Sequence, residues 1–162
     1  MFKFATIAVA LGFIGATAGA GFADSKGPPH SHVRGDFSAG QPGDSKKPAR
    51  VVQVVMRETD GRMIYVPSRL EIRKGEQVRF VLRNVGVTDH EFILATVAEN
   101  LKHAEEMKKN PDMEHDDPNA LRLAPNKAGE LLWQFTKQGE FEFGCLIPGH
   151  REAGMIGTIV VK

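Results

Sequence analysis

The chain has 162 residues and a single cysteine. Charged residues make up 25% of it, and the formal net charge at pH 7 is +1. A near-neutral charge without a basic block excludes the electrostatic surface on which nucleic-acid binding depends. The length is sufficient for one domain with its own hydrophobic core.

Residues 1–23 have the pattern of a secretory signal peptide. One lysine near the start precedes an apolar run from Phe4 to Ile14, and small residues follow, with alternative cleavage points after Ala20 or Ala23. The apolar run is too short to cross a membrane. We therefore expect export to the periplasm and a mature chain with no membrane span.

The next segment, residues 24–49, is dense in Gly, Pro, Ser and charged side chains. It has too little apolar surface to offset the entropy lost on ordering, which predicts a flexible tail. The domain is expected over residues 50–162, where β-branched and aromatic runs are separated by turn residues. Apolar side chains recur there with a period of two at Val78, Phe80 and Leu82, at Leu131, Trp133 and Phe135, and at Phe141, Phe143 and Cys145. This pattern predicts an all-β fold, an antiparallel β-sandwich.

Residues 95–127 interrupt the β pattern as an insertion that contains a helix. Val97, Leu101 and Ala104 stand at helical spacing, and Pro111 ends the helix. The segment is acidic, which is typical of a helix on the solvated surface.

The segment "GCLIPGHREAGM" holds the lone cysteine, Cys145, and His150 and Met155 follow it at intervals of five residues. Cysteines usually pair in an oxidising compartment. Because Cys145 has no partner within the chain, it is buried, metal-bound or reactive. If Cys145 ends an inward-facing strand, a short loop can fold His150 and Met155 back over it. Thiolate, imidazole and thioether together suit copper in both oxidation states.

An electron-transfer copper site needs a second imidazole. His90, in "VTDHEFIL", stands where a polar turn enters an apolar run, whereas the other histidines lie in the tail or the insertion. We therefore predict a metal site made of His90, Cys145, His150 and Met155. Zinc is disfavoured because a thioether adds little to its binding. A Cys/His hydrolase would leave Met155 without a role.

The spacing "C-x4-H-x4-M" after an "F-x-F-x-C" strand, the closing strand "GTIVV" and the upstream "DHEF" resemble the cupredoxins, the plastocyanin, azurin and auracyanin superfamily. The "CLIPGHREAGM" loop with "DHEF" is most similar to exported cupredoxins of bacterial copper-resistance systems. The resemblance implies a Greek-key β-sandwich that binds one type 1 copper per chain through His90, Cys145, His150 and Met155. Many cupredoxins have Asn after the first histidine, where this chain has Glu91.

A second group of donors lies outside the predicted strands and comprises His30, His32, His103, Met107, Met113 and His115. His103 and Met107 are expected to share a helix face at positions i and i+4, and Met with His suits Cu(I). These six residues are candidates for a weaker second copper site. The alternative is a scatter of ordinary surface residues.

Two functions stay open at this point. The first is a soluble electron carrier, not an enzyme, in which copper cycles between Cu(I) and Cu(II). Its redox protein partner would dock near His150, on an apolar patch made of Ile147, Pro148, Ala153 and Ile156. The alternative is a periplasmic copper-tolerance protein that binds, buffers or oxidises excess copper, and the additional His and Met residues favour it. We expect a monomer in either case.

Overall fold

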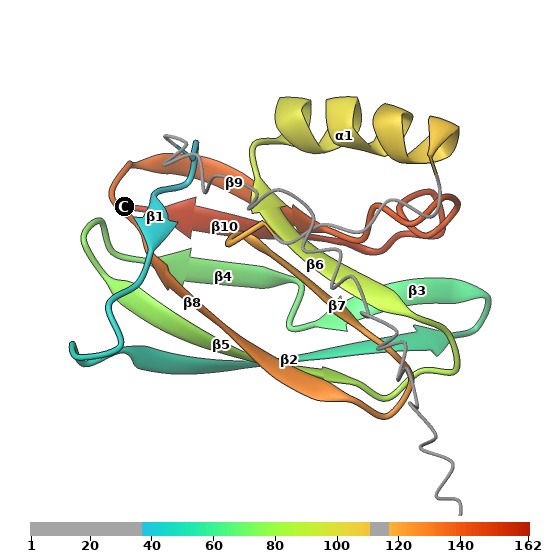
Figure 1. Cartoon of the computed structure of the whole chain (residues 1–162), viewed down its shortest axis with the longest axis horizontal. Coiled ribbons are helices and arrows are strands. Elements are labelled where there is room, and N and C mark those ends of the chain that lie inside the picture. The colour runs from blue at the N-terminus through green and yellow to red at the C-terminus, as the bar shows by residue number, and fades with distance from the viewer. Residues whose placement is uncertain (1–36, 111–116) are drawn as a thin grey trace, which may run out of the picture. The chain divides into compact units, whose positions relative to one another are not determined.

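The computed structural model describes residues 37–110 and 117–162. The predicted signal peptide and the first part of the predicted tail lie outside the described residues. The described chain forms two β-sheets that enclose a common core (Figure 1). In strand order, the first sheet contains β1 (Gln41–Pro42), β8 (Ala128–Gln134), β5 (Gln77–Asn84), β2 (Arg50–Thr59) and β3 (Arg62–Val66). The second contains β4 (Arg69–Ile72), β10 (Ile156–Val161), β9 (Gly139–Gly144), β6 (His90–Ala95) and β7 (Ala120–Leu123).

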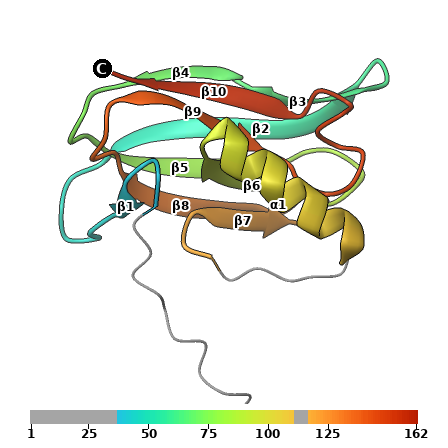
Figure 2. The same cartoon turned by 90° about the horizontal axis from the view of Figure 1, so that it is seen from above.

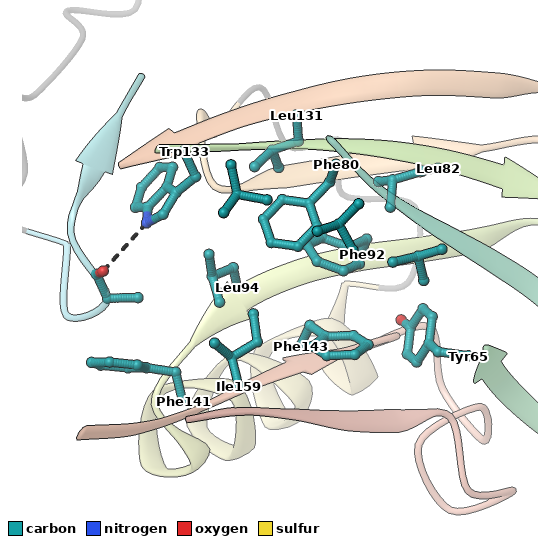
Figure 3. Close-up of a cluster of buried hydrophobic side chains, with 14 of the residues drawn as sticks. Tyr65, Phe80, Leu82, Phe92, Leu94, Leu131, Trp133, Phe141, Phe143 and Ile159 are labelled. Carbon is teal, nitrogen blue, oxygen red and sulfur yellow. Dashed lines mark hydrogen bonds between the residues drawn. The ribbon is translucent and has the colours of Figure 1, made fainter. Parts of the chain in front are cut away.

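The hydrophobic core between the sheets contains all three alternating sets predicted from the sequence. Figure 3 shows members of each set, among them Phe80, Trp133 and Phe143. Each of those nine side chains is at most 5% exposed. Tyr65 and Phe92 both pack against Phe143, with ring centroids 5.0 Å away in each case. Full burial of one such side chain contributes roughly 2 to 3 kcal/mol relative to exposure. The predicted β-sandwich is confirmed.

The sheets are mixed, whereas the sequence pattern predicted antiparallel pairing throughout. β5 runs parallel to β2, and β4 runs parallel to β10. The chain leaves β3 at the edge of the first sheet, forms β4 at the edge of the second, and returns to the first as β5. Side-chain alternation has the same period in both kinds of pairing, so it could not distinguish them.

The helix α1 (Val97–Lys109) lies on the outer face of the second sheet, over β6 and β9 (Figures 1 and 2). It begins at a capping box in which Thr96 and Glu99 each accept a backbone N–H from the other. The predicted apolar face is wrong in part, because Val97 and Leu101 are 46% and 48% exposed. The helix instead packs through Asn100, Ala104 and Met107. Since α1 covers its outer face, β6 is buried on both sides. No helix in the described ranges is long and apolar enough to cross a membrane.

The observed domain starts earlier than the predicted boundary at residue 50. The Phe37 ring packs edge-on against Trp133 with centroids 5.3 Å apart. The indole Nε1 of Trp133 donates to the Ala39 carbonyl at 3.4 Å (Figure 3). β1 then pairs with β8. Because the segment before residue 50 is mostly polar, its sequence pattern did not indicate that Phe37 and Ala39 pack against Trp133. The predicted insertion also contains a strand, because β7 pairs with β6.

Candidate metal centre

Three of the predicted metal-site residues converge at one end of the sandwich. His90 is the first residue of β6, Cys145 directly follows β9, and His150 lies in the next loop. Their candidate ligand atoms all lie within 4.8 Å of one another. His150 Nδ1 is 3.3 Å from Cys145 Sγ and 3.3 Å from His90 Nδ1.

Strand pairing determines where these side chains meet. Gly144, the residue before Cys145, lies opposite Ile93 of β6 on one side and Ile156 of β10 on the other. β9, the central strand of the second sheet, therefore places Cys145 close to the start of β6. His90 and Cys145 are both fully buried, so these two side chains form the solvent-excluded side of the site.

The loop between β9 and β10 folds back on itself through its backbone. The Cys145 N–H donates to the Met155 carbonyl at 3.1 Å, and the Met155 N–H donates to the His150 carbonyl at 3.1 Å. Gly149 and Gly154 have φ values of 89° and 99°, a region that favours glycine. These contacts hold Met155 beside Cys145, and its side chain is fully buried in the same core cluster.

The three clustered side chains are neutral without a metal at pH 7. Burial raises the pKa of the Cys145 thiol to about 12, although the Glu91 N–H donates to its sulfur at 3.3 Å. Burial also lowers the pKa of His90 and of His150, each below the usual histidine value. Two neutral imidazoles are ready to coordinate, whereas the thiol must release its proton when a metal binds.

Glu58, at the end of β2, contacts the cluster and was not predicted from the sequence. Its Oε1 lies 3.1 Å from His90 Nε2. Burial acts to raise the pKa of Glu58, but hydrogen bonds from Thr88 and Val87 outweigh it and lower the pKa to about 2. Glu58 and His90 are 32 residues apart, and the pairing of β2 with β5 brings their neighbourhoods together. No local motif signals this contact.

The comparisons with known proteins agree with this geometry. The model of the copper-binding proteins of the plastocyanin/azurin family matches residues 52–162. The chain belongs to the plastocyanin/azurin family. It is 51% identical to the copper-resistant cuproprotein CopI of Rubrivivax gelatinosus over 133 residues, covering 82% of this chain and 78% of that protein. The copper-resistant cuproprotein CopI of Pseudomonas aeruginosa is 34% identical, with 76% of this chain and 82% of that protein covered.

The fold is also found among solved structures. Auracyanin B superposes with a TM-score of 0.60 at 23% identity, covering 79% of this chain and 99% of that chain. The described donors fit the family's metal, because a buried thiol and two neutral imidazoles within one small cluster are a set that suits copper. Copper is therefore the metal that this plastocyanin/azurin family member binds.

Glu91, which stands where many cupredoxins have Asn, makes two kinds of contact. Its backbone N–H donates to Cys145 Sγ, and its backbone carbonyl accepts from the Tyr65 hydroxyl. Its carboxylate is buried, and one oxygen lies 3.7 Å from Nη1 of Arg122, which also pairs with Asp89. A partly exposed arginine therefore faces the charge beside the metal centre.

Of the six candidate donors of a second site, the two that the structure describes, His103 and Met107, do not join this cluster. Met107 is fully buried and packs with Ile93, Ala104 and Leu146 beneath α1. His103 lines a separate cavity of about 260 Å³ beside Glu99. Four of the predicted donors lie outside the described residues, namely His30, His32, Met113 and His115. Met107 therefore has a packing role that helical spacing alone did not reveal.

Proposed function

We propose that this chain is an exported copper protein that contributes to copper tolerance through one type 1 centre. His90, Cys145, His150 and Met155 are the proposed ligands. The observation that carries the proposal is the buried Cys145 with two histidine nitrogens beside it. The names of the relatives from Rubrivivax gelatinosus and Pseudomonas aeruginosa support the tolerance role.

The protein residues prepare this site before metal arrives. The β-sheets hold His90 and Cys145, and the loop hydrogen bonds hold His150 and Met155 close to them. Bound copper supplies a one-electron Cu(I)/Cu(II) couple. A preformed, largely buried donor set loses little conformational entropy on binding, which favours tight capture of copper. We further propose a monomer without enzymatic activity, located in the periplasm after removal of residues 1–23.

Electron transfer is the second candidate function, and the surface near His150 favours it. His150 is half-buried, unlike the fully buried His90. Pro148 is exposed in the same loop and Ile156 is exposed at the start of β10, whereas Ile147 is partly buried against the core. Such an apolar surface would let a redox partner approach the imidazole edge, through which electrons would pass. The two functions are compatible.

The six outlying donors remain a hypothesis for a second, weaker copper site that serves tolerance. Replacing His30, His32, His103, Met113 and His115 together, and leaving the packed Met107 intact, tests it without opening the core. We expect a lower copper stoichiometry under excess Cu(I) with an unchanged visible spectrum. An unaltered stoichiometry would identify these residues as ordinary surface.

One set of strains tests the main proposal. A strain lacking the gene is complemented with the wild-type chain, with Cys145→Ser, or with Lys46→Gln as a control at an exposed position. We expect the wild-type and control proteins to be coloured with Cu(II) and to restore growth on high copper. Cys145→Ser should be colourless and fail to restore growth. Full copper tolerance without the gene, with loss of respiratory or photosynthetic electron flow, would favour the electron carrier instead.

A further inference from the structure

We propose that Glu58 orients His90 toward the metal and adds its negative charge to the copper centre. This inference rests on the proposed function, because Glu58 would act through His90, one of the proposed copper ligands. Glu58 reaches the centre from β2 in the first sheet, whereas His90 and Cys145 are held by the second sheet. The carboxylate therefore links the two layers at the metal end.

The contact between Glu58 and His90 determines which nitrogen of the imidazole is free. An ionised carboxylate only accepts hydrogen bonds, so His90 Nε2 must donate to Glu58 Oε1 across their 3.1 Å separation. A neutral imidazole carries one proton, which leaves Nδ1 with a free lone pair. That nitrogen is the one that faces His150 Nδ1 at 3.3 Å. Glu58 thus selects the tautomer that presents Nδ1 to the cluster.

Further donors hold the carboxylate in place. The Val87 N–H donates to Oε2 of Glu58 at 3.1 Å, the Thr88 N–H donates to Oε1 at 3.2 Å, and the Thr88 hydroxyl donates to Oε1 at 2.8 Å. Gly86 makes room for the group, because a Cβ at that position would collide with Oε2 of Glu58. The loop of residues 85–88, between β5 and β6, is therefore shaped around this side chain.

Asn84 fixes the same loop from inside the protein. It is fully buried, and its amide donates to the carbonyls of Thr88 and Leu123, each at 2.8 Å. Its side-chain oxygen accepts the Gly86 N–H at 2.9 Å. An isolated surface ion pair needs no such support, whereas a carboxylate that positions a metal ligand does.

The carboxylates of Glu58 and Glu91 have different surroundings. Glu91 lies beside the guanidinium of Arg122, whereas the groups that contact Glu58 are backbone amides, a hydroxyl and an imidazole. No cation stands among these contacts of Glu58. A negative charge one imidazole away from copper stabilises Cu(II) relative to Cu(I). The presence of Glu58 should therefore lower the reduction potential of the centre.

The first test uses the metal-free protein. Nitrogen-15 NMR of the His90 ring should show a proton on Nε2 in the wild-type protein. Glu58→Ala should lose this preference, whereas Glu58→Gln, whose amide oxygen still accepts, should retain most of it. Gly86→Ala should act like Glu58→Ala, because the new methyl group displaces the carboxylate. A His90 ring protonated on Nδ1, or a tautomer that does not respond to Glu58→Ala, would overturn the orienting role even if copper binds.

The second test uses the copper-loaded protein. Glu58→Ala should weaken copper binding by about 10- to 100-fold, as loss of a ligand's outer partner typically does. Glu58→Gln should raise the reduction potential measured by voltammetry. The control is Glu71→Gln, which removes an exposed carboxylate paired with Lys162 near the C-terminal end of β10 and should leave both values unchanged.

The two tests separate the inference from the proposed function. A wild-type affinity in Glu58→Ala together with an unchanged potential in Glu58→Gln would refute the role of Glu58 while leaving the copper centre intact. A wild-type chain that binds no copper would refute the proposed function and the charge effect together. The tautomer in the metal-free protein would still decide whether Glu58 orients His90.

Discussion

Glu142 and Arg151 form a two-point ion pair that joins the strand before Cys145 to the loop that carries His150. Arg151 Nη2 donates to Glu142 Oε2 at 2.9 Å, and Nη1 donates to Oε1. The Glu142 Oε1 also accepts from Asn100 of α1 at 3.0 Å. One buried carboxylate therefore holds both the helix and the ligand loop against β9.

Arg151→Ala should destabilise the protein, because it leaves the Glu142 carboxylate buried without the two hydrogen bonds that Arg151 donates. The two side chains are only 15% and 8% exposed, and breaking such a pair costs about 3 kcal/mol. Urea unfolding of the metal-free protein measures the loss. Arg79→Ala is the matched control, because it breaks the exposed pair with Glu130 and should cost about 0 to 1 kcal/mol. Equal losses in the two variants would contradict the assignment of Glu142 as a buried anchor.

The stability of the metal-free protein should fall as pH rises above 8. The Cys145 thiol has its pKa raised from about 9 to about 12 by burial. Between these values the unfolded chain releases a proton that the folded chain retains, so the free energy of unfolding decreases with rising pH. The loss from pH 8 to pH 10 should be about 1 kcal/mol, and Cys145→Ser should abolish that share. An identical slope in the wild-type protein and the serine variant would exclude this origin.

A chain that starts at residue 50 should be less stable than one that starts at Phe37. The shorter chain loses β1 and the cover that Phe37 and Ala39 give to Trp133. Exposing this much apolar surface should cost about 2 kcal/mol or more. Trp133 is the single tryptophan, so its fluorescence emission should shift to longer wavelength in the shorter chain. Matching emission and matching urea midpoints would show that residues 37–49 are dispensable.

Glu91→Gln should raise the reduction potential of the copper centre, because it removes a buried negative charge next to a ligand. Arg122→Gln should lower the potential, because it removes the cation that faces that charge. The increase for Glu91→Gln should be smaller than that for Glu58→Gln, since Arg122 already offsets part of the Glu91 charge. Voltammetry of the three variants checks the order, and shifts of the same sign for Glu91→Gln and Arg122→Gln would refute this electrostatic account.

The strands and the clustered side chains were accessible from sequence because their signals are local. A period of two marked the inward-facing residues of β5, β8 and β9, and the spacing from Cys145 to His150 and Met155 lies within one loop. His90 was found because it opens an apolar run that becomes β6. These inferences needed no knowledge of which strands pair.

Features that depend on pairing between distant segments were not accessible. The contact between Glu58 and His90 requires β2 to lie parallel to β5, and alternation carries no information on direction. The buried face of the helix was mispredicted because the pattern of hydrophobic residues placed Leu101 on it. Asn100 is buried there instead, because its amide donates hydrogen bonds to β6 and Glu142. The packing of Met107, which the sequence offered as a candidate donor or an ordinary surface residue, was not accessible, because its partners Ile93 and Leu146 come from other elements.

The pairing of Gly144 with Ile156 closes the loop that carries His150 at a fixed width. Cys145 and Met155 are the two ends of that loop, and their backbones are joined by a hydrogen bond. Apart from Leu146, which is buried beneath α1, and Arg151, which pairs with Glu142, the residues between these two ends can therefore change without altering how β9 and β10 align. Natural variation or a grafted segment can thus alter the metal chemistry of this chain within one loop. The two sheets that support the metal site need not change.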